Sequence, residues 1–206
     1  MNYDLHSRTE KTVFAGVAAM SASGQYGKTR ICEGIVGYAD LNLGAAARPV
    51  LEAQIKAAGG RFKGVRYISA WHDDPAARGS SAEPIPGILT QKKFREGFAC
   101  LAPLGLVFDA WMYHTQLAEL VDLARAFPQT TIVLNHVGGA IGIGPYEGKR
   151  SEVLAEWRPG MKALAACPNV HVKVGGMGMR LFGFAILEGE SEQAPAHAAD
   201  FDMHVW

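Results

Sequence analysis

The sequence predicts an α/β fold in which strands and helices alternate along the chain. Two observations support this prediction. Short apolar segments rich in β-branched residues recur, and each of the first four is followed by a segment with apolar residues at helical spacing. The strand-like segments begin roughly 30 to 40 residues apart, which fits βα units. Near-continuous apolar strands separated by amphipathic helices are typical of a parallel sheet that is covered on both faces.

Five strands and four helices are expected in order. The first strand is followed by Leu51 and Ile55 at helical spacing and by Gly59 as a helix stop, and Pro128 stops a later helix. The strands are expected at residues 30–41, 61–70, 105–113, 130–139 and 169–179. The helices are expected at residues 48–60, 91–105, 116–128 and 151–168.

The polar residues near the strand ends decide between an open doubly wound sheet and a (β/α)₈ barrel. A nucleotide-binding open sheet would carry its glycine-rich turn after the first strand. Here several successive strands end in ionisable residues instead, and such side chains converge at the carboxyl-terminal mouth of a barrel. We therefore predict a barrel arrangement. The strand-end residues are Asp40, Arg66, Asp109 with His114, His136 and Lys173.

Length and composition favour one domain over residues 1–206, with residues 185–206 as a loop or frayed tail because they lack periodicity. Lys plus Arg and Asp plus Glu are both 20, so the formal charge is zero and neither nucleic acid nor an acidic membrane is an expected partner. No apolar run could span a bilayer. Cys32, Cys100 and Cys167 have no CxxC spacing and are expected to be reduced, which indicates a cytoplasmic protein.

His136 in "TTIVLNHVGG" is the main candidate for chemistry. A histidine that ends a strand can be a hydrogen-bonded core residue. Gly138 and Gly139 favour a second interpretation, because they allow a sharp turn and the approach of a ligand. A neutral imidazole at that place can bind a divalent metal or act as an acid–base group. A phosphate-loop interpretation of the following loop fails, because Ile143 and Arg150 stand where the motif needs Gly and Ser or Thr.

Other polar residues have two interpretations each. Arg66 interrupts an apolar strand and needs an anionic partner, either an internal carboxylate such as Asp109 or the carboxylate of a substrate, which we favour. Lys173 faces the same choice. His114 either contacts a polar small molecule, together with Asp109 and Trp111, or is a solvated loop residue. The segment "WHDDP" resembles a metal cluster by composition, but its aspartates precede a proline and are expected to form a turn.

Several segments together resemble a known family. "FKGVR", "LVFDAW", "QLAELVDLARAFPQTTIVLNHVGG" and "NVHVKVGGMG" are similar, in this order, to the amidohydrolase-related TIM-barrel hydrolases, in the branch that includes 2-pyrone-4,6-dicarboxylate lactonase and sulfomuconolactone hydrolase. The resemblance covers roughly residues 12–184. It implies a catalytic or metal-binding role for His136, and it places family positions on Arg66, Asp109 and Lys173. Asn135 and Gly175 stand where the family motifs have aspartate and serine.

Two family features are not found in the sequence, namely an HxH pair after the first barrel strand and an aspartate after the eighth. The units resemble strands three to seven of the barrel, so we expect a partial TIM barrel and an internal fragment of the family's fold. Five units cannot close an eight-stranded cylinder, and two parallel edges would remain. We therefore expect a homo-oligomer.

The resemblance implies a hydrolase that activates water to open a small carboxylated lactone or related cyclic ester, either with a divalent metal such as zinc or by acid–base catalysis without one. In this hypothesis His136 polarises water or relays a proton, Arg66 binds an acidic group, and Asp109, His114 and Lys173 line the mouth. One alternative is a catalytically inactive truncated barrel that binds the same ligands. Another is a decarboxylase of the same superfamily.

Overall fold

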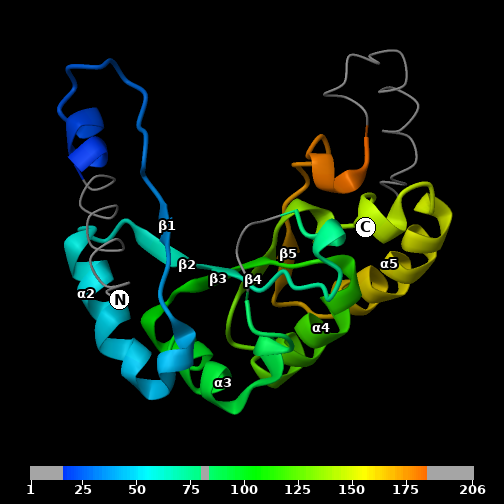
Figure 1. Cartoon of the computed structure of the whole chain (residues 1–206). Helices are drawn as coiled ribbons and strands as arrows, with labels where there is room; N and C mark the ends of the chain where they lie inside the picture. The colour runs from blue at the N-terminus through cyan, green and yellow to red at the C-terminus, as the bar shows by residue number, and fades with distance from the viewer. Residues whose placement is uncertain (1–15, 80–83, 185–206) are drawn as a thin grey trace. The chain divides into compact units, whose positions relative to one another are not determined.

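The computed structural model describes residues 16–79 and 84–184 (Figure 1). One five-stranded sheet is formed in the order β1-β2-β3-β4-β5, so neighbours in sequence are neighbours in the sheet. The pairings of β1 with β2 and of β4 with β5 are parallel. The α/β prediction is confirmed. The strands are β1 Ile35–Gly37, β2 Phe62–Ile68, β3 Val107–Trp111, β4 Ile132–Leu134 and β5 Val170–Val172.

Every expected helix is present, and most elements are shorter than the sequence pattern indicates. Residues 16–22 form a further helical segment. The predicted tail at 185–206 lies outside the described residues. None of the helices in the described part of the chain combines the length and apolar character that crossing a bilayer requires. The helices within the strand–helix repeat are α2 Ala47–Ala57, α3 Lys92–Phe98, α4 Leu117–Ala126 and α5 Arg150–Ala165.

Two strands end early for a local reason. After β1, the Asp40 carboxylate accepts a hydrogen bond from the backbone N–H of Asn42 at 2.9 Å and caps a 3-10 helix, Leu41–Ala46. After β4, the chain enters a 3-10 turn at His136–Gly138. Hydrogen bonds of the following turn replace the sheet ladder in both cases, with a side-chain acceptor after β1 and backbone acceptors after β4. An apolar pattern does not reveal such bonds.

The chain divides into two compact units, which are described separately. The described part of the first unit comprises residues 16–67, 91–109 and 129–131. Its core is aromatic: Phe94 meets Tyr67 edge-on at 5.1 Å between ring centroids, and Phe98 meets Phe108 at 5.0 Å. Such edge-to-face pairs add specific geometry to the burial of apolar surface. Helix α3 packs closely on the 3-10 helix after β1.

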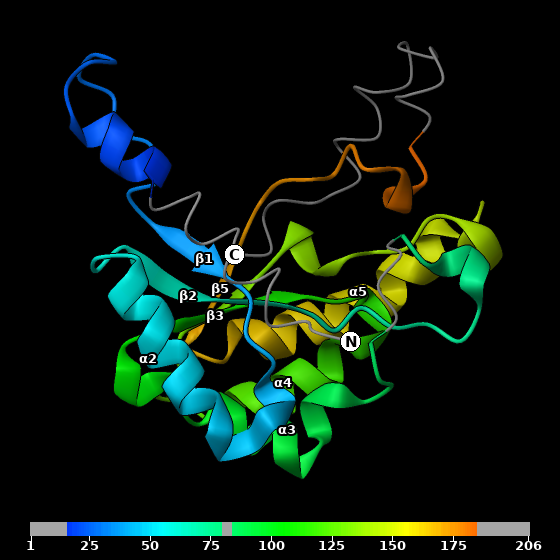
Figure 2. The same cartoon turned by 60° about the vertical axis from the view of Figure 1, so that its left-hand side comes forward.

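The described part of the second unit comprises residues 68–79, 84–90, 110–128 and 132–184. Helices α4 and α5 lie side by side in it (Figure 2). Leu117 of α4 faces Gly160 of α5, where an added Cβ would lie 2.8 Å from the Leu117 Cβ. Because Gly160 has no side chain, the two helices can approach each other closely at this point. Helix α5 contains Pro159 and continues through it.

Candidate functional site

Asn135 anchors the turn that carries His136. It is fully buried, its backbone N–H donates to the Ala110 carbonyl at 2.9 Å, and its side-chain Nδ2 donates to the same carbonyl at 3.0 Å. An ionised aspartate has no hydrogen to donate to a carbonyl. The amide at this position therefore fits a turn that is tied to β3 by two donors.

The turn after β4 has an uncommon backbone. His136 and Val137 have φ angles of +49° and +46°, and Gly138 and Gly139 follow with +78° and +57°. Left-handed conformations cost non-glycine residues on the order of 1–2 kcal/mol each, and they cluster at functional sites. The surroundings hold the turn in place: the Trp157 Nε1–H donates to the Val137 carbonyl at 2.7 Å.

The half-buried imidazole of His136 has three close neighbours. Its Nδ1 lies 3.3 Å from the Gly175 carbonyl oxygen, and its ring meets the Trp111 ring edge-on at 5.0 Å between centroids. Gly176 lies against the ring itself. A carbonyl oxygen only accepts, so a neutral imidazole in this bond carries its proton on Nδ1. Nε2 then keeps its lone pair.

Lys173 follows β5 directly, and its backbone forms hydrogen bonds with residues on both sides of His136. Its N–H donates to the Leu134 carbonyl at 2.8 Å, and its carbonyl accepts from the Val137 N–H at 3.2 Å. The residue is exposed. The structure thus brings Lys173 and His136 to the ends of neighbouring strands, as the sequence predicts, while a contact of the ammonium group with substrate stays a prediction.

Arg66 and Asp109 form an ion pair inside the first unit. The Arg66 Nε donates to Asp109 Oδ1 at 2.8 Å, with the carboxylate side chain 3% exposed and the arginine side chain 45% exposed. Asp109 therefore contacts Arg66. The sequence gives this internal carboxylate as one of two partners for the arginine. This pairing compensates a buried charge. Binding of a substrate acid by Arg66 stays a prediction.

His114 is buried in the second unit. Its Nδ1 accepts a hydrogen bond from the Ile141 N–H at 3.3 Å, and its Nε2 lies 3.6 Å from Oε2 of Glu156. Burial lowers the pKa of His114 from 6.5 to about 4, and a hydrogen bond with Gly139 offsets part of this effect. The imidazole is therefore neutral at physiological pH. It differs from the solvated loop residue that the sequence leaves open, and its contact with substrate stays a prediction.

The segment after β2 forms the expected turn. The Asp74 carboxylate accepts from the Ala76 N–H at 2.8 Å and caps the 3-10 helix Pro75–Ala77. His72 binds the Tyr146 hydroxyl through Nε2 at 3.0 Å. The composition of "WHDDP" thus serves local structure, as predicted.

A pocket beside Trp111 contains two arginines that the sequence analysis did not single out. Trp111 lines this pocket, and its ring also contacts the His136 ring within the second unit, while His136 itself is not among the lining residues. Arg78 follows the 3-10 helix Pro75–Ala77, and Arg180 begins the 3-10 helix Arg180–Phe182. These elements are too short for periodicity to give a signal, and only the folded chain brings the two arginines to the pocket that Trp111 lines. The lining residues are Ala76, Arg78, Gly79, Trp111, Ile143, Met179, Arg180 and Leu181.

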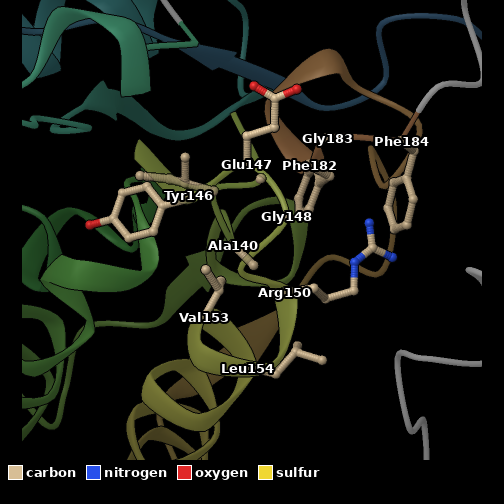
Figure 3. Close-up of a pocket in the computed structure, with 12 residues that line it drawn as sticks. Ala140, Tyr146, Glu147, Gly148, Arg150, Val153, Leu154, Phe182, Gly183 and Phe184 are labelled. Carbon is tan, nitrogen blue, oxygen red and sulfur yellow. The ribbon is translucent and has the colours of Figure 1, made fainter. Parts of the chain in front are cut away.

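A second, mainly apolar pocket lies where residues 140–154 meet residues 182–184 (Figure 3). The Gly142 N–H donates to the Leu181 carbonyl at 2.7 Å, and the Arg150 guanidinium lies 4.2 Å above the Phe184 ring. Cation–π contacts of this kind fix a long side chain against an aromatic face. No residue that the sequence analysis predicts for the site lines this pocket.

The divalent metal that the sequence leaves open has no complete site among the described residues. Across residues 16–79 and 84–184, no group of three or more His, Cys, Asp or Glu side chains could hold a metal ion. Catalytic zinc sites in proteins use three protein ligands and an open position. His136 alone supplies one, so the described residues do not fit a complete site.

Two known proteins are similar to this chain in sequence. An uncharacterized protein, y4mH, from Sinorhizobium fredii is 36% identical over 147 residues, which are 71% of this chain and 45% of that protein. L-fucono-1,5-lactonase from Burkholderia ambifaria is 29% identical over 157 residues, or 73% of this chain and 44% of the lactonase.

Two crystal structures of an amidohydrolase from Burkholderia multivorans share the fold. The form with bound zinc has a TM-score of 0.60 and 23% identity, over 82% of this chain and 50% of that one. The form with bound HEPES has a TM-score of 0.55 and 22% identity, over 77% and 50% of the two chains. The five parallel strands with their helices match half of this amidohydrolase barrel, which confirms the predicted partial barrel.

The chain spans about half the length of the relatives it matches, with 44–50% of each covered. A match to the amidohydrolase family extends over residues 28–204, which is most of the sequence. The chain belongs to the amidohydrolase family.

Proposed function

We propose that this chain carries part of the active site of a hydrolase that opens a small carboxylated lactone or related cyclic ester. One observation carries the proposal: the His136 imidazole stands at the end of β4 in a left-handed turn, with Nδ1 at the Gly175 carbonyl oxygen. Nε2 is the proposed base. The relationship to L-fucono-1,5-lactonase supports a lactone as substrate.

In the proposed reaction the Nε2 atom of His136 accepts a proton from a water molecule. The resulting hydroxide equivalent attacks the lactone carbonyl, the ring C–O bond breaks, and the protonated imidazole returns the proton to the departing ring oxygen. The product is an open hydroxy acid. The bond from Nδ1 to Gly175 stabilises the tautomer that can accept the proton and orients the ring.

The pocket beside Trp111 supports a carboxylated substrate. Arg78 and Arg180 both line it, and guanidinium groups bind carboxylates with two parallel hydrogen bonds. Trp111 would hold the substrate between this pocket and His136. Within the second unit, the substrate contacts expected for His114 and Lys173 are part of the same proposal. Those expected for Arg66 and Asp109 stay predictions for the first unit.

No step of this proposal passes through a metal ion, because the described residues do not form a site for one. The related amidohydrolase from Burkholderia multivorans does bind zinc. Hydrolysis assays with added zinc and with a chelator test whether the same holds for this chain.

Replacing His136 with alanine tests the proposal. We expect hydrolysis of a panel of carboxylated lactones, followed by release of acid, to fall ~10²–10⁴-fold in H136A, the usual contribution of a general base. His171, an exposed histidine of β5, supplies the matched control H171A, which should keep wild-type activity. Unchanged turnover in H136A would reject the role of His136. Binding of lactones without turnover by the wild-type chain would favour the ligand-binding alternative.

A further inference from the structure

We infer that Gly176 is a positioning residue whose missing side chain sets the orientation of the His136 imidazole; this inference rests on the proposed role of His136 as the base. A Cβ built on Gly176 would overlap Nδ1 of His136 and lie 2.9 Å from both Cγ and Cε1. Carbon atoms in favourable contact lie ~3.5–4.0 Å apart. The imidazole therefore occupies space that any side chain at position 176 would fill.

The contact involves the nitrogen on which the tautomer depends. Nδ1 is the atom that meets the Gly175 carbonyl, and it is also the atom that a Cβ at 176 would overlap. A methyl group at this position forces the ring away from the Gly175 carbonyl. The ring then loses both its orientation and the hydrogen bond that places the proton on Nδ1.

Gly176 also connects the imidazole to the arginine pocket. It has a φ of +73°, and its carbonyl accepts the Met179 N–H at 3.0 Å, so the chain turns here. Met179 and Arg180, which follow this turn, line the pocket beside Trp111. The glycine thus starts the segment that passes from the His136 ring to the proposed binding site for the substrate acid.

The experiment compares Gly176→Ala with Gly148→Ala in the full chain. Gly148 has a φ of +72° and no atom within 4 Å of an added Cβ, so G148A introduces the same backbone strain without the collision. Long-range ¹H–¹⁵N spectra of the His136 imidazole report its tautomer, and kcat, KM and the pH profile are measured on the best lactone of the panel.

We expect G176A to change the His136 nitrogen signals, to shift the acid limb of the pH profile and to lower kcat ~10–100-fold with little change in KM, since small displacements of a catalytic group cost this much. G148A should match the wild type in all three. A wild-type imidazole spectrum in G176A would overturn the inference, and it would do so even if no lactone is hydrolysed, because the spectrum does not depend on turnover.

A measurement on the unchanged protein covers the case in which G176A does not fold. The geometry requires nuclear Overhauser effects between the Gly176 α-protons and the His136 ring protons of the wild type. Their presence supports the contact, and their absence overturns it.

Discussion

His114 illustrates how burial fixes the charge of one side chain. Its side chain is 0% exposed, and within the described part of the chain its Nε2 has no hydrogen-bond partner, with Glu156 at 3.6 Å. Burial disfavours the imidazolium form and lowers the pKa to about 4. The folded protein therefore resists protonation of His114 over a pH range in which an unfolded chain takes up the proton.

The stability of the protein should consequently depend on His114 between pH 6.5 and about 4. Above pH 6.5 the His114 side chain is neutral in both the folded and the unfolded state, so its contribution to the free energy of unfolding is fully present. As the pH falls, the unfolded state binds the proton first, and ~3 kcal/mol of unfolding free energy is lost by the time the folded state is protonated as well. Urea unfolding at pH 7.5, 5.5 and 4.5 measures this loss.

The matched variants are His114→Gln and His171→Gln. H114Q is expected to lose less stability than the wild type between pH 7.5 and 4.5, whatever it loses at pH 7.5, because its side chain does not titrate. H171Q changes an exposed histidine and should follow the wild type. Parallel pH curves for H114Q and the wild type would contradict the assignment.

The ion pair of Arg66 and Asp109 shows a second way in which a single residue is constrained. Asp109 is almost fully buried and Arg66 is nearly half exposed, so the carboxylate depends on the pair more than the guanidinium does. A buried carboxylate without a cation would be costly, whereas water can solvate an exposed arginine. This asymmetry is compatible with a structural role for the pair beside the substrate role that we propose.

At the scale of elements, close approach between backbones decides the packing of α3. A Cβ on Gly97, in the last turn of this helix, would collide with the backbone carbonyl of Leu41. In an exposed helix interior, replacing glycine with alanine stabilises by ~1 kcal/mol. Here the helix would have to move away from the 3-10 helix after β1, so the sign should be reversed.

We therefore expect Gly97→Ala to lower the free energy of unfolding by ~1–3 kcal/mol, the usual cost of forcing extra volume into a packed contact. Gly16→Ala is the comparison, because Gly16 is also helical and has no atom within 4 Å of an added Cβ. Thermal unfolding of both variants checks the order. A G97A variant as stable as the wild type would show that α3 is free to shift.

The elements also show what the sequence could and could not predict. Apolar periodicity is a local property, so it located the five described strands and the four helices that follow the first four of them, and it placed His136 and Lys173 at strand ends. It did not predict the helical segment at residues 16–22. The left-handed turn at His136 and Val137 is held by Trp157, which is about 20 residues away and forms a bond that no spacing encodes. The sequence pattern did not predict Arg78, Arg180 or Gly176, because only tertiary contacts bring these residues to the site.

At the scale of the whole molecule, the ends of the sheet matter most. Among the strands that the structure describes, β1 and β5 are the outer ones of the order β1-β2-β3-β4-β5. Near β1, Ile31, Val36 and Tyr38 are exposed apolar residues, at 53%, 42% and 45%. An exposed apolar edge strand is a template for pairing with another chain, and proteins avoid such pairing with charged residues, especially lysine.

We accordingly propose that the chain self-associates through the edge at β1. Light scattering across a concentration series should give a mass above that of one 22.1 kDa chain, and Val36→Lys should shift the equilibrium toward the monomer because it places a charge on the edge strand. Leu43→Lys adds the same charge at an exposed residue of the same unit outside β1, so it should associate like the wild type. A wild-type chain that is a monodisperse monomer at every concentration would refute self-association. Equal effects of the two lysines would place the contact elsewhere than β1.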